Sequence, residues 1–256
     1  MNVYQVARAN QFGNLVEKHK AQTITYFILT AIFLLLGVLF LQLGIGGIPL
    51  WGGWRLHSIW LLVFGLFFVI AACYFAITAI ATIGVRLFLF EQGLIYKNFS
   101  ATQIIPYDTM TVIWQGRLPI DSKDTSAATE KIYTLETNAG KKLKITDIFD
   151  KVNEIGDRLQ KELVCRRLPD VLNDYEQGYE LQFGPLSISQ SGVGSVLGTL
   201  PWKEIEAVKI RNAVVVFEGK GGNLLNWITV QVPEIPNLCL FLALVEEVLR
   251  CDRLGR

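Results

Sequence analysis

Side chains that could form a catalytic dyad or triad are scarce in this sequence of 256 residues. Its two histidines, His19 and His57, both lie in the first quarter of the chain. Ser187, Ser189 and Ser191 alternate along a short segment, a spacing typical of the polar face of a strand. A serine or cysteine nucleophile needs a neighbouring base, and histidine is the usual one. We therefore expect a protein that is not an enzyme, with a lipid-acting enzyme that uses carboxylates and lysines as the remaining enzymatic hypothesis.

No cofactor or metal site is predicted from the motifs. Asp121 and Asp124 could begin a calcium loop, but no glutamate follows at the spacing of an EF-hand. The run Gly219–Gly222 lacks the Gly-Lys-Ser/Thr ending of a phosphate-binding loop, so we interpret it as a hairpin turn. The four cysteines show no Cys-x-x-Cys pair, as expected for a reducing compartment.

Basic residues concentrate at two places in the region that follows the apolar N-terminal third. We predict these residues as contacts with anionic lipid: Lys141, Lys142, Lys144, Arg166 and Arg167. Each cation near an anionic bilayer surface contributes roughly 1 kcal/mol. The alternative is a solvated turn and a helix C-terminus whose dipole favours cations. Specific phosphoinositide binding is not predicted, because the loop 97–103 carries one lysine and the loop 190–199 none.

Charge differs between the two halves of the polar region. Residues 86–168 hold 13 Lys and Arg against 11 Asp and Glu, a net charge of +2, whereas residues 169–256 hold 7 against 11, a net charge of −4. A nucleic-acid-binding protein would need a strongly basic face. We therefore predict no nucleic-acid partner.

Two long apolar runs, Ile24–Ile48 and Ser58–Ile83, contain no charged residue. A bilayer core of roughly 30 Å is crossed by about 20 apolar residues in a helix. The runs therefore predict a two-helix transmembrane hairpin over residues 24–83. They are too long for the apolar region of a signal peptide.

The flanking cations predict the orientation of this hairpin. Arg8, Lys18 and Lys20 precede the first run and Arg86 follows the second, whereas the linker between the runs carries Arg55 alone. Under the positive-inside rule, both ends of the chain face the cytoplasm. We predict a multi-pass protein of the cell membrane, with residues 1–23 as a cytoplasmic N-terminal segment.

Small residues recur at helical spacing in both runs: Thr30, Gly37 and Gly44 in the first, and Gly65, Ala72, Ala76 and Ala79 in the second. Small side chains let membrane helices approach closely, so we expect these stripes to pack the hairpin together. Formation of a homo-oligomer through the helices is the alternative. An oligomeric pore or transport accessory subunit is a further hypothesis, with Gln42 as its strongly polar intramembrane side chain.

After Arg86 the apolar pattern changes from helical to strand periodicity. The expected strands are 85–90, 93–97, 103–106, 110–115, 130–137 and 141–145, with a mobile loop over 116–129. Asp147 is a candidate N-cap for an amphipathic helix whose apolar positions include Val152 and Leu163. The first unit is therefore several antiparallel strands followed by one helix.

The same pattern recurs in residues 169–256. We match Tyr179–Phe183 and Leu186–Ser189 to the first hairpin of the first unit, and Leu200–Val208 to Ile105–Ile113. Further strands are expected at 213–218 and 225–232, and a last helix at about 235–251. Self-similarity in a fixed order indicates an internal repeat. The seam is expected near Pro169–Gln177, which is polar and turn-prone.

Several short motifs carry a resemblance to a known family: Phe90-Glu91-x-Gly93-Leu94, Pro106-Tyr107-Asp108, Tyr133-Thr134-Leu135, Phe183-Gly184-Pro185-Leu186 and Leu200-Pro201-Trp202-Lys203-Glu204-Ile205. With them, the chain resembles an uncharacterised family of prokaryotic membrane proteins that have two transmembrane helices followed by PH-like domains. The resemblance implies tandem PH-like domains over 84–168 and 169–256, each an antiparallel half-barrel capped by a C-terminal helix. It implies no catalytic or cofactor-binding residue.

Together these observations predict a membrane helical hairpin with an α+β region. We expect a non-enzymatic membrane protein that presents tandem PH-like domains to the cytoplasm for protein or membrane-surface interaction. Its expected partners are the lipid bilayer and a protein that the sequence does not identify.

Overall fold

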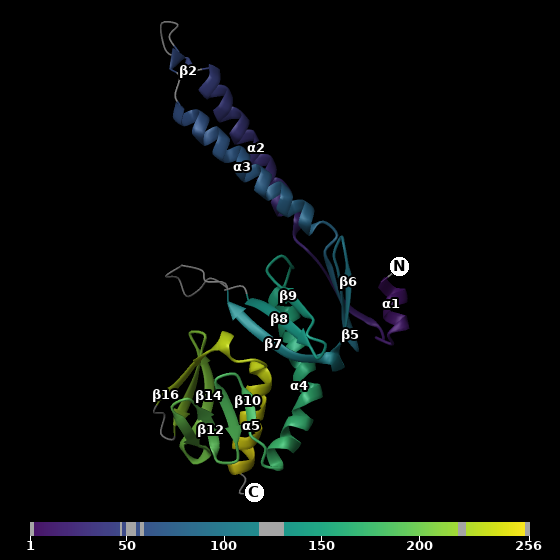
Figure 1. Cartoon of the computed structure of the whole chain (residues 1–256), viewed down its shortest axis with the longest axis vertical. Coiled ribbons are helices and arrows are strands. Elements are labelled where there is room, and N and C mark those ends of the chain that lie inside the picture. The colour runs from purple at the N-terminus through teal and green to yellow at the C-terminus, as the bar shows by residue number, and fades with distance from the viewer. Residues whose placement is uncertain are drawn as a thin grey trace.

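The computed structural model describes residues 3–46, 48–49, 55–56, 59–117, 131–219 and 224–253. The described chain is α+β, with small antiparallel sheets and two long apolar helices near the N-terminus. Figure 1 shows these two helices projecting as one hairpin from a strand-rich body. The predicted α+β class is therefore confirmed.

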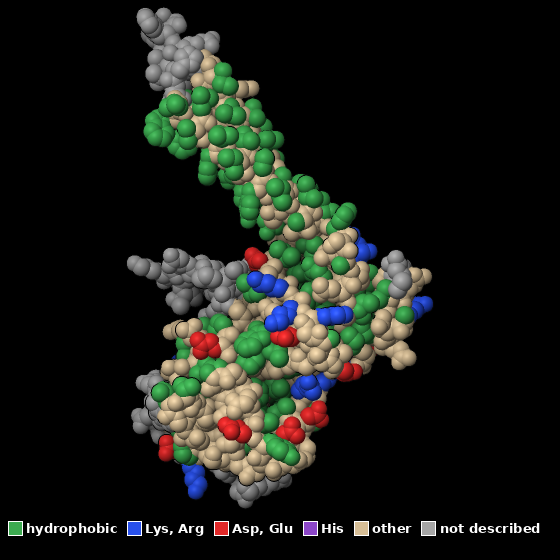
Figure 2. Space-filling model, in the orientation of Figure 1, with side chains coloured by type: hydrophobic (Ala, Val, Ile, Leu, Met, Phe, Trp, Pro, Cys, Tyr) green, Lys and Arg blue, Asp and Glu red, His purple; other side chains and the backbone are tan. Residues whose placement is uncertain are grey.

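The helical hairpin consists of α2 (Thr23–Gly46) and α3 (Ile59–Thr82), joined through β2 (Ile48–Pro49) and β3 (Arg55–Leu56). Each helix has 24 residues and is long and apolar enough to cross a membrane. Most of their side chains face outward, and Leu35 is 72% exposed. Figure 2 shows an almost continuous hydrophobic surface along both helices.

Small residues pack the helical hairpin, as the sequence predicted. Gly37 and Gly44 are buried on α2, and Gly65, Ala72 and Ala79 are buried on α3. A Cβ atom added to Gly65 would lie 2.7 Å from Cγ of Leu41. The glycines therefore allow the two helix backbones to approach closely.

The first unit begins before the helical hairpin rather than after it. Its first sheet has the order β1-β4-β5-β6, formed by β1 (Leu15–Lys20), β4 (Arg86–Phe90), β5 (Gly93–Lys97) and β6 (Thr102–Pro106). Residues 15–20 therefore belong to the strand-rich body, although the sequence suggested a separate N-terminal segment. The reason is long-range pairing: β1 is a polar edge strand with weak strand signals, and its partner β4 follows the whole hairpin.

A short N-terminal helix covers the outer face of this first sheet. The helix α1 (Val3–Ala9) and Phe12 pack against Phe88, Phe90 and Ile95 in a small separate core. Phe12 is 1% exposed. The opposite face of the sheet carries Leu87, Leu89 and Leu94 into the main core.

The first unit continues with a short 3-10 helix, η1 (Tyr107–Thr109), and a second sheet of order β7-β8-β9. Its strands are β7 (Met110–Arg117), β8 (Lys131–Thr137) and β9 (Lys142–Ile145), and α4 (Val152–Glu176) follows. The predicted strands are thereby confirmed at their described positions. Residues 118–130, which hold most of the predicted mobile loop and the Asp121 and Asp124 pair, lie outside the described residues.

The second unit repeats this order of elements. A four-stranded sheet, β10 (Leu181–Phe183), β11 (Leu186–Ser189), β12 (Gly192–Ser195) and β13 (Gly198–Pro201), precedes η2 (Trp202–Glu204). A three-stranded sheet follows, formed by β14 (Ile205–Arg211), β15 (Val214–Gly219) and β16 (Leu224–Gln231). The 3-10 helix η3 (Val232–Glu234) and α5 (Leu238–Arg253) complete the unit.

The positions of the two-residue turns correct the predicted match between the units. The turn Glu91-Gln92 between β4 and β5 corresponds to Gln190-Ser191 between β11 and β12, so β10 corresponds to β1. The sequence comparison had matched β10 and β11 to β4 and β5, because β1 was not recognised as a strand. The second unit joins β10 to β11 through Gly184-Pro185 alone, whereas the first unit has residues 21–85 between β1 and β4. The helical hairpin is an insertion into the first strand connection of the first unit.

The helix α4 also differs from its predicted bounds. It starts at Val152 instead of Asp147, because residues 146–151 turn aside to contact the base of the helical hairpin, where Gln22 N donates to Ile148 O over 2.7 Å. It then continues through the predicted turn-prone seam at Pro169–Gln177 to Glu176. Packing overrides the proline there, since Tyr175 contacts the Trp202 ring at 6.5 Å between centroids.

Candidate functional site

Two of the five predicted lipid contacts, Lys141 and Lys142, lie at the end of the strand-rich body that is remote from the helical hairpin. Lys141 and Lys142 follow the turn between β8 and β9, where Asn138 N donates to Thr109 O of η1. The register places η1 at the end of the first sheet that is remote from the hairpin, because Lys20 and Arg86 pair at the hairpin end. Lys144 is exposed and lies two pairs further along β9, toward Ile148 and Phe149, which contact Gln22 and Ala21 at the base of the hairpin. The lipid contact of the five residues stays a prediction.

Arg166 and Arg167 lie within α4 rather than at its end. The guanidinium of Arg166 donates to Asp108 of η1 and, over 2.6 Å, to Oε1 of Gln92, and it stands 5.5 Å from the centre of the Tyr107 ring. Burial raises the pKa of Tyr107 to about 12, against the smaller lowering effect of nearby arginines. Arg166 therefore joins α4 to η1 and to the β4–β5 turn, a structural role.

Among the described residues, those that the sequence analysis considered for catalysis or metal binding do not gather in one site. Nε2 of His19 lies 3.0 Å from Oε2 of Glu17, within hydrogen-bond distance. The Arg158 guanidinium donates to Oε1 of the same carboxylate over 3.0 Å. Burial alone would raise the pKa of Glu17, but these partners outweigh it and the pKa is lowered. Within the described part of the chain, no group of three metal-binding side chains is present.

Asn237 makes three hydrogen bonds between the two units, and no pattern in the sequence predicts them. This residue precedes α5, has a left-handed backbone with φ of 54°, and lies against the edge of β7 that β8 leaves free. Its Oδ1 accepts from Ile113 N over 2.7 Å, its Nδ2 donates to Thr111 O over 2.9 Å, and its backbone N donates to Ile113 O over 2.9 Å. Asn237 therefore replaces a neighbouring strand along this edge.

A buried polar chain supports the same interface. Gln160 of α4 donates from Nε2 to Oε1 of Gln115 on β7 over 3.0 Å, and Cys239 of α5 contacts Oε1 of Gln160. Both glutamines are less than 9% exposed. Because α4 and α5 also share one apolar core, the two units form one continuous body.

The second unit has an equivalent strand edge that no described element covers. Since η1 and η2 correspond, and both following strands have a bulge after their first residue, Val208 of β14 is the counterpart of Ile113. Among the described strands, β14 pairs with β15 alone. A groove of about 690 Å³ lies between this edge and α5, lined by Glu206, Ala207, Val208, Leu242, Val245, Glu246, Leu249 and Arg250.

The groove, which we call the β14–α5 groove, combines an apolar floor with an acidic rim. Val208 and Leu242 are partly buried, Val245 and Leu249 are buried, and Glu246 is exposed. Arg250 forms an ion pair with Glu247, with 2.5 Å between the guanidinium nitrogen and the carboxylate oxygen. An apolar floor beside a free strand edge is suited to an extended or turning peptide segment with a basic side chain.

Residues 1–253 match the model of a family of unknown function, DUF6585. The chain belongs to this family. Among curated proteins, none is significantly similar to it in sequence.

The sequence of this DUF6585 protein contains one signal that could have indicated the groove. The segments Ile105–Ile113 and Leu200–Val208 were matched correctly, so the two edges were known to be equivalent. The sequence does not indicate that Asn237, more than 120 residues after Ile113, covers the edge of β7. Gln42 of the pore hypothesis is exposed on the outside of the helical hairpin, so a pore would require several copies.

Proposed function

We propose that this DUF6585 protein is a non-enzymatic, multi-pass protein of the cell membrane that presents two PH-like domains to the cytoplasm for protein interaction. The β14–α5 groove of the second unit is its docking site. The occupant is a segment of a cytoplasmic protein that lies along the β14 edge and carries a basic side chain.

The membrane location is supported by the exposure of α2 and α3. Large apolar side chains such as Leu35 and Ile77 are 72% and 69% exposed along helices long enough to cross a bilayer. In water, so large an apolar surface would be unfavourable, whereas in lipid it is solvated.

The insertion of the helical hairpin within a sheet constrains its topology. Lys20 before α2 and Arg86 after α3 are directly paired across β1 and β4, so both ends of the hairpin must lie on the same side of the membrane. Lys18, Lys20 and Arg86 flank that side, whereas Arg55 lies at the hairpin tip. The positive-inside rule favours the cytoplasm for the strand-rich body.

The PH-like assignment rests on the element order shared by both units. Each has a four-stranded meander, a 3-10 turn, a three-stranded meander and a C-terminal helix. That is the plan of a half-barrel closed by a helix. The repeat is consistent with duplication of one ancestral domain.

One observation carries the docking site: Asn237 occupies the outer edge of β7, whereas among the described strands its counterpart β14 pairs with β15 alone. The first unit therefore shows which kind of contact this surface accepts, namely a backbone segment with hydrogen bonds to the strand edge. Glu246 at the rim, and the net charge of −4 over residues 169–256, favour a basic segment.

Site-specific photo-crosslinking in cells tests this proposal. A photoreactive residue at Leu242, inside the groove, should give one discrete protein adduct. The same residue at Ile210, which is 42% exposed on β14 outside the groove, is the matched control and should not give it. The adduct should also disappear when Val208→Glu is introduced. Absence of an adduct at Leu242, or an equal adduct at both positions, would contradict the docking site.

A further inference from the structure

Three cations form a row across the first sheet at the end next to the helical hairpin. Lys20, Arg86 and Lys97 are direct neighbours on β1, β4 and β5, since Lys20 pairs with Arg86 and Arg86 pairs with Lys97. Residues directly opposite one another in antiparallel strands point to the same face of the sheet. All three are exposed, and none of them has an ion pair with another described residue. We call them the basic row.

Like charges placed directly opposite each other destabilise a sheet. The face that carries the basic row is the one covered by α1, whose sequence contains no acidic residue. Lys18, one pair further from the hairpin on this face, adds a fourth cation and stands 5.5 Å from the centre of the Phe88 ring. An anion bound from outside would therefore relieve the repulsion on this face.

The second unit provides an internal comparison. Counting from the equivalent turns Glu91-Gln92 and Gln190-Ser191, the counterparts of Lys20, Arg86 and Lys97 are Gly184, Pro185 and Val196. None of these is charged. The basic row is thus confined to the unit whose strand connection contains the helical hairpin.

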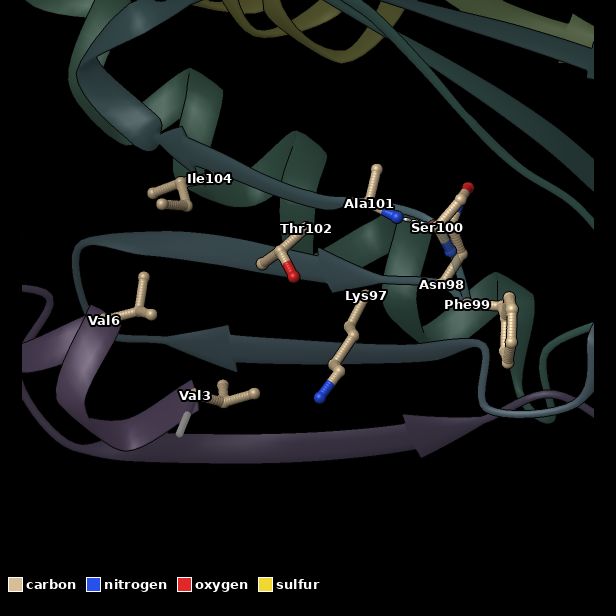
Figure 3. Close-up of a pocket in the computed structure, with 9 residues that line it drawn as sticks. All are labelled: Val3, Val6, Lys97, Asn98, Phe99, Ser100, Ala101, Thr102 and Ile104. Carbon is tan, nitrogen blue, oxygen red and sulfur yellow. Dashed lines mark hydrogen bonds between the residues drawn. The ribbon is translucent and has the colours of Figure 1, made fainter. Parts of the chain in front are cut away.

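A rigid turn beside the basic row presents an apolar side chain. The side-chain oxygen of Asn98 accepts from the backbone N of Ser100 over 3.1 Å and of Ala101 over 2.6 Å, which fixes the β5–β6 turn. Phe99 at its tip is 91% exposed. Figure 3 shows Phe99 at the turn, and Lys97 projecting from the sheet on the side where Val3 and Val6 of α1 lie.

A hollow of about 340 Å³ separates the turn from α1. It is lined by Val3, Val6, Ile104 and residues 97–102, so its walls combine the apolar side chains of α1 and β6 with the polar side chains of Asn98, Ser100 and Thr102, and Lys97 also lines it. Figure 1 shows the upper end of β5 and β6 beside the lower end of α3. The chain reaches α2 three residues after Lys20, so the basic row lies at the level where the helical hairpin would leave the bilayer.

We propose that the basic row binds the phosphate of an anionic lipid in the adjacent leaflet, with Phe99 inserted among the headgroups. This inference rests on the proposed membrane location of α2 and α3. Cations just outside a membrane span attract anionic lipid, and an aromatic ring is favourable at the membrane interface. The occupant is a lipid because the row, the exposed ring and the hollow all lie at the base of the helical hairpin.

The test uses the full chain in nanodiscs of phosphatidylcholine, with and without phosphatidylglycerol. Hydrogen exchange of residues 98–102 should slow when phosphatidylglycerol is present, and native mass spectrometry should show preferential retention of that lipid. A row variant, Lys20→Gln/Arg86→Gln/Lys97→Gln, should lose both effects. The matched control, Lys141→Gln/Lys142→Gln/Lys203→Gln, removes the same charge away from the helical hairpin, at the β8–β9 turn and on η2 of the second unit, and should keep them. Each cation contributes roughly a fivefold change in affinity for anionic lipid. The preference of the row variant for phosphatidylglycerol should therefore fall at least about tenfold.

Three results would overturn the lipid site: equal lipid preference in the row and control variants, no effect of phosphatidylglycerol on the native chain, or the same protection from inorganic phosphate in phosphatidylcholine alone. The variant Phe99→Ser keeps every cation, and faster exchange of residues 98–102 in it supports insertion of the ring. Unchanged exchange would refute that insertion.

Carbonate extraction separates the lipid site from the proposed membrane location, because a native chain that is extracted contradicts the membrane location itself. A native chain that is retained but shows no lipid preference contradicts the lipid site alone.

Discussion

Asn237→Ala should destabilise the body strongly, because the Asn237 side chain makes two of the three hydrogen bonds that join this residue to the edge of β7. The substitution removes two hydrogen bonds, from Ile113 N and to Thr111 O. Each is worth about 1 kcal/mol net, and a buried N–H left without an acceptor costs about 1–3 kcal/mol. Alanine in the left-handed region at φ of 54° adds about 1 kcal/mol. Counting the unpaired Ile113 N–H, the lost bond to Thr111 O and the backbone term once each, the expected loss of unfolding free energy is about 3–5 kcal/mol.

Thermal unfolding of the full chain in detergent, followed by tryptophan fluorescence, measures this effect. For a chain of this size the loss corresponds to a fall in Tm of about 6–20 °C. Asn212→Ala is the matched control, because Asn212 also has a left-handed backbone, at φ of 50°, in the β14–β15 turn. It should lower Tm by no more than about 3 °C. Equal shifts in both variants would refute the hydrogen-bond account and leave backbone strain as the cause.

Three further perturbations test other parts of the fold. Phe12→Ala should cost about 3–5 kcal/mol in urea unfolding, because the ring is buried against the first sheet; a loss below about 1 kcal/mol would place the N-terminal segment outside the body. Gly156→Ala puts a Cβ within 2.0 Å of the Tyr133 ring and should lower Tm sharply, whereas Gly116→Ala, whose nearest neighbour lies at 3.7 Å, should not. The lowered pKa of Glu17 adds stability that is present above its unfolded pKa and lost as the pH falls through the folded pKa. Glu17→Gln should therefore flatten the acid limb of a plot of Tm against pH, and an unchanged limb would contradict this role.

Elements with strong local patterns were predictable from the sequence. The two apolar runs, the Glu91-Gln92 hairpin turn and the paired motifs around Pro106 and Pro201 all lie at their predicted places. In each case periodicity or a turn signal within a few residues determined the element. The same local information gave the small-residue packing of the helical hairpin.

Features that depend on long-range contacts were not predictable. β1 is a short polar strand whose partner β4 lies beyond the helical hairpin, so its pairing left no local pattern. α4 continues through Pro169 because Tyr175 packs on Trp202 of the second unit. The predicted lipid contacts, chosen from charge clusters along the sequence, do not include the basic row, because Lys20, Arg86 and Lys97 are adjacent only in the sheet.

The most direct test of the central claim is cysteine accessibility on the two sides of the membrane. In a chain whose native cysteines are replaced, Leu56→Cys marks the hairpin tip and Val196→Cys marks the second unit, where Val196 is 92% exposed. A membrane-impermeant maleimide added to intact cells should label Leu56→Cys at once, and Val196→Cys only after permeabilisation. Labelling of both variants in intact cells, or of neither, would contradict a hairpin that crosses the membrane and returns to the sheet it left.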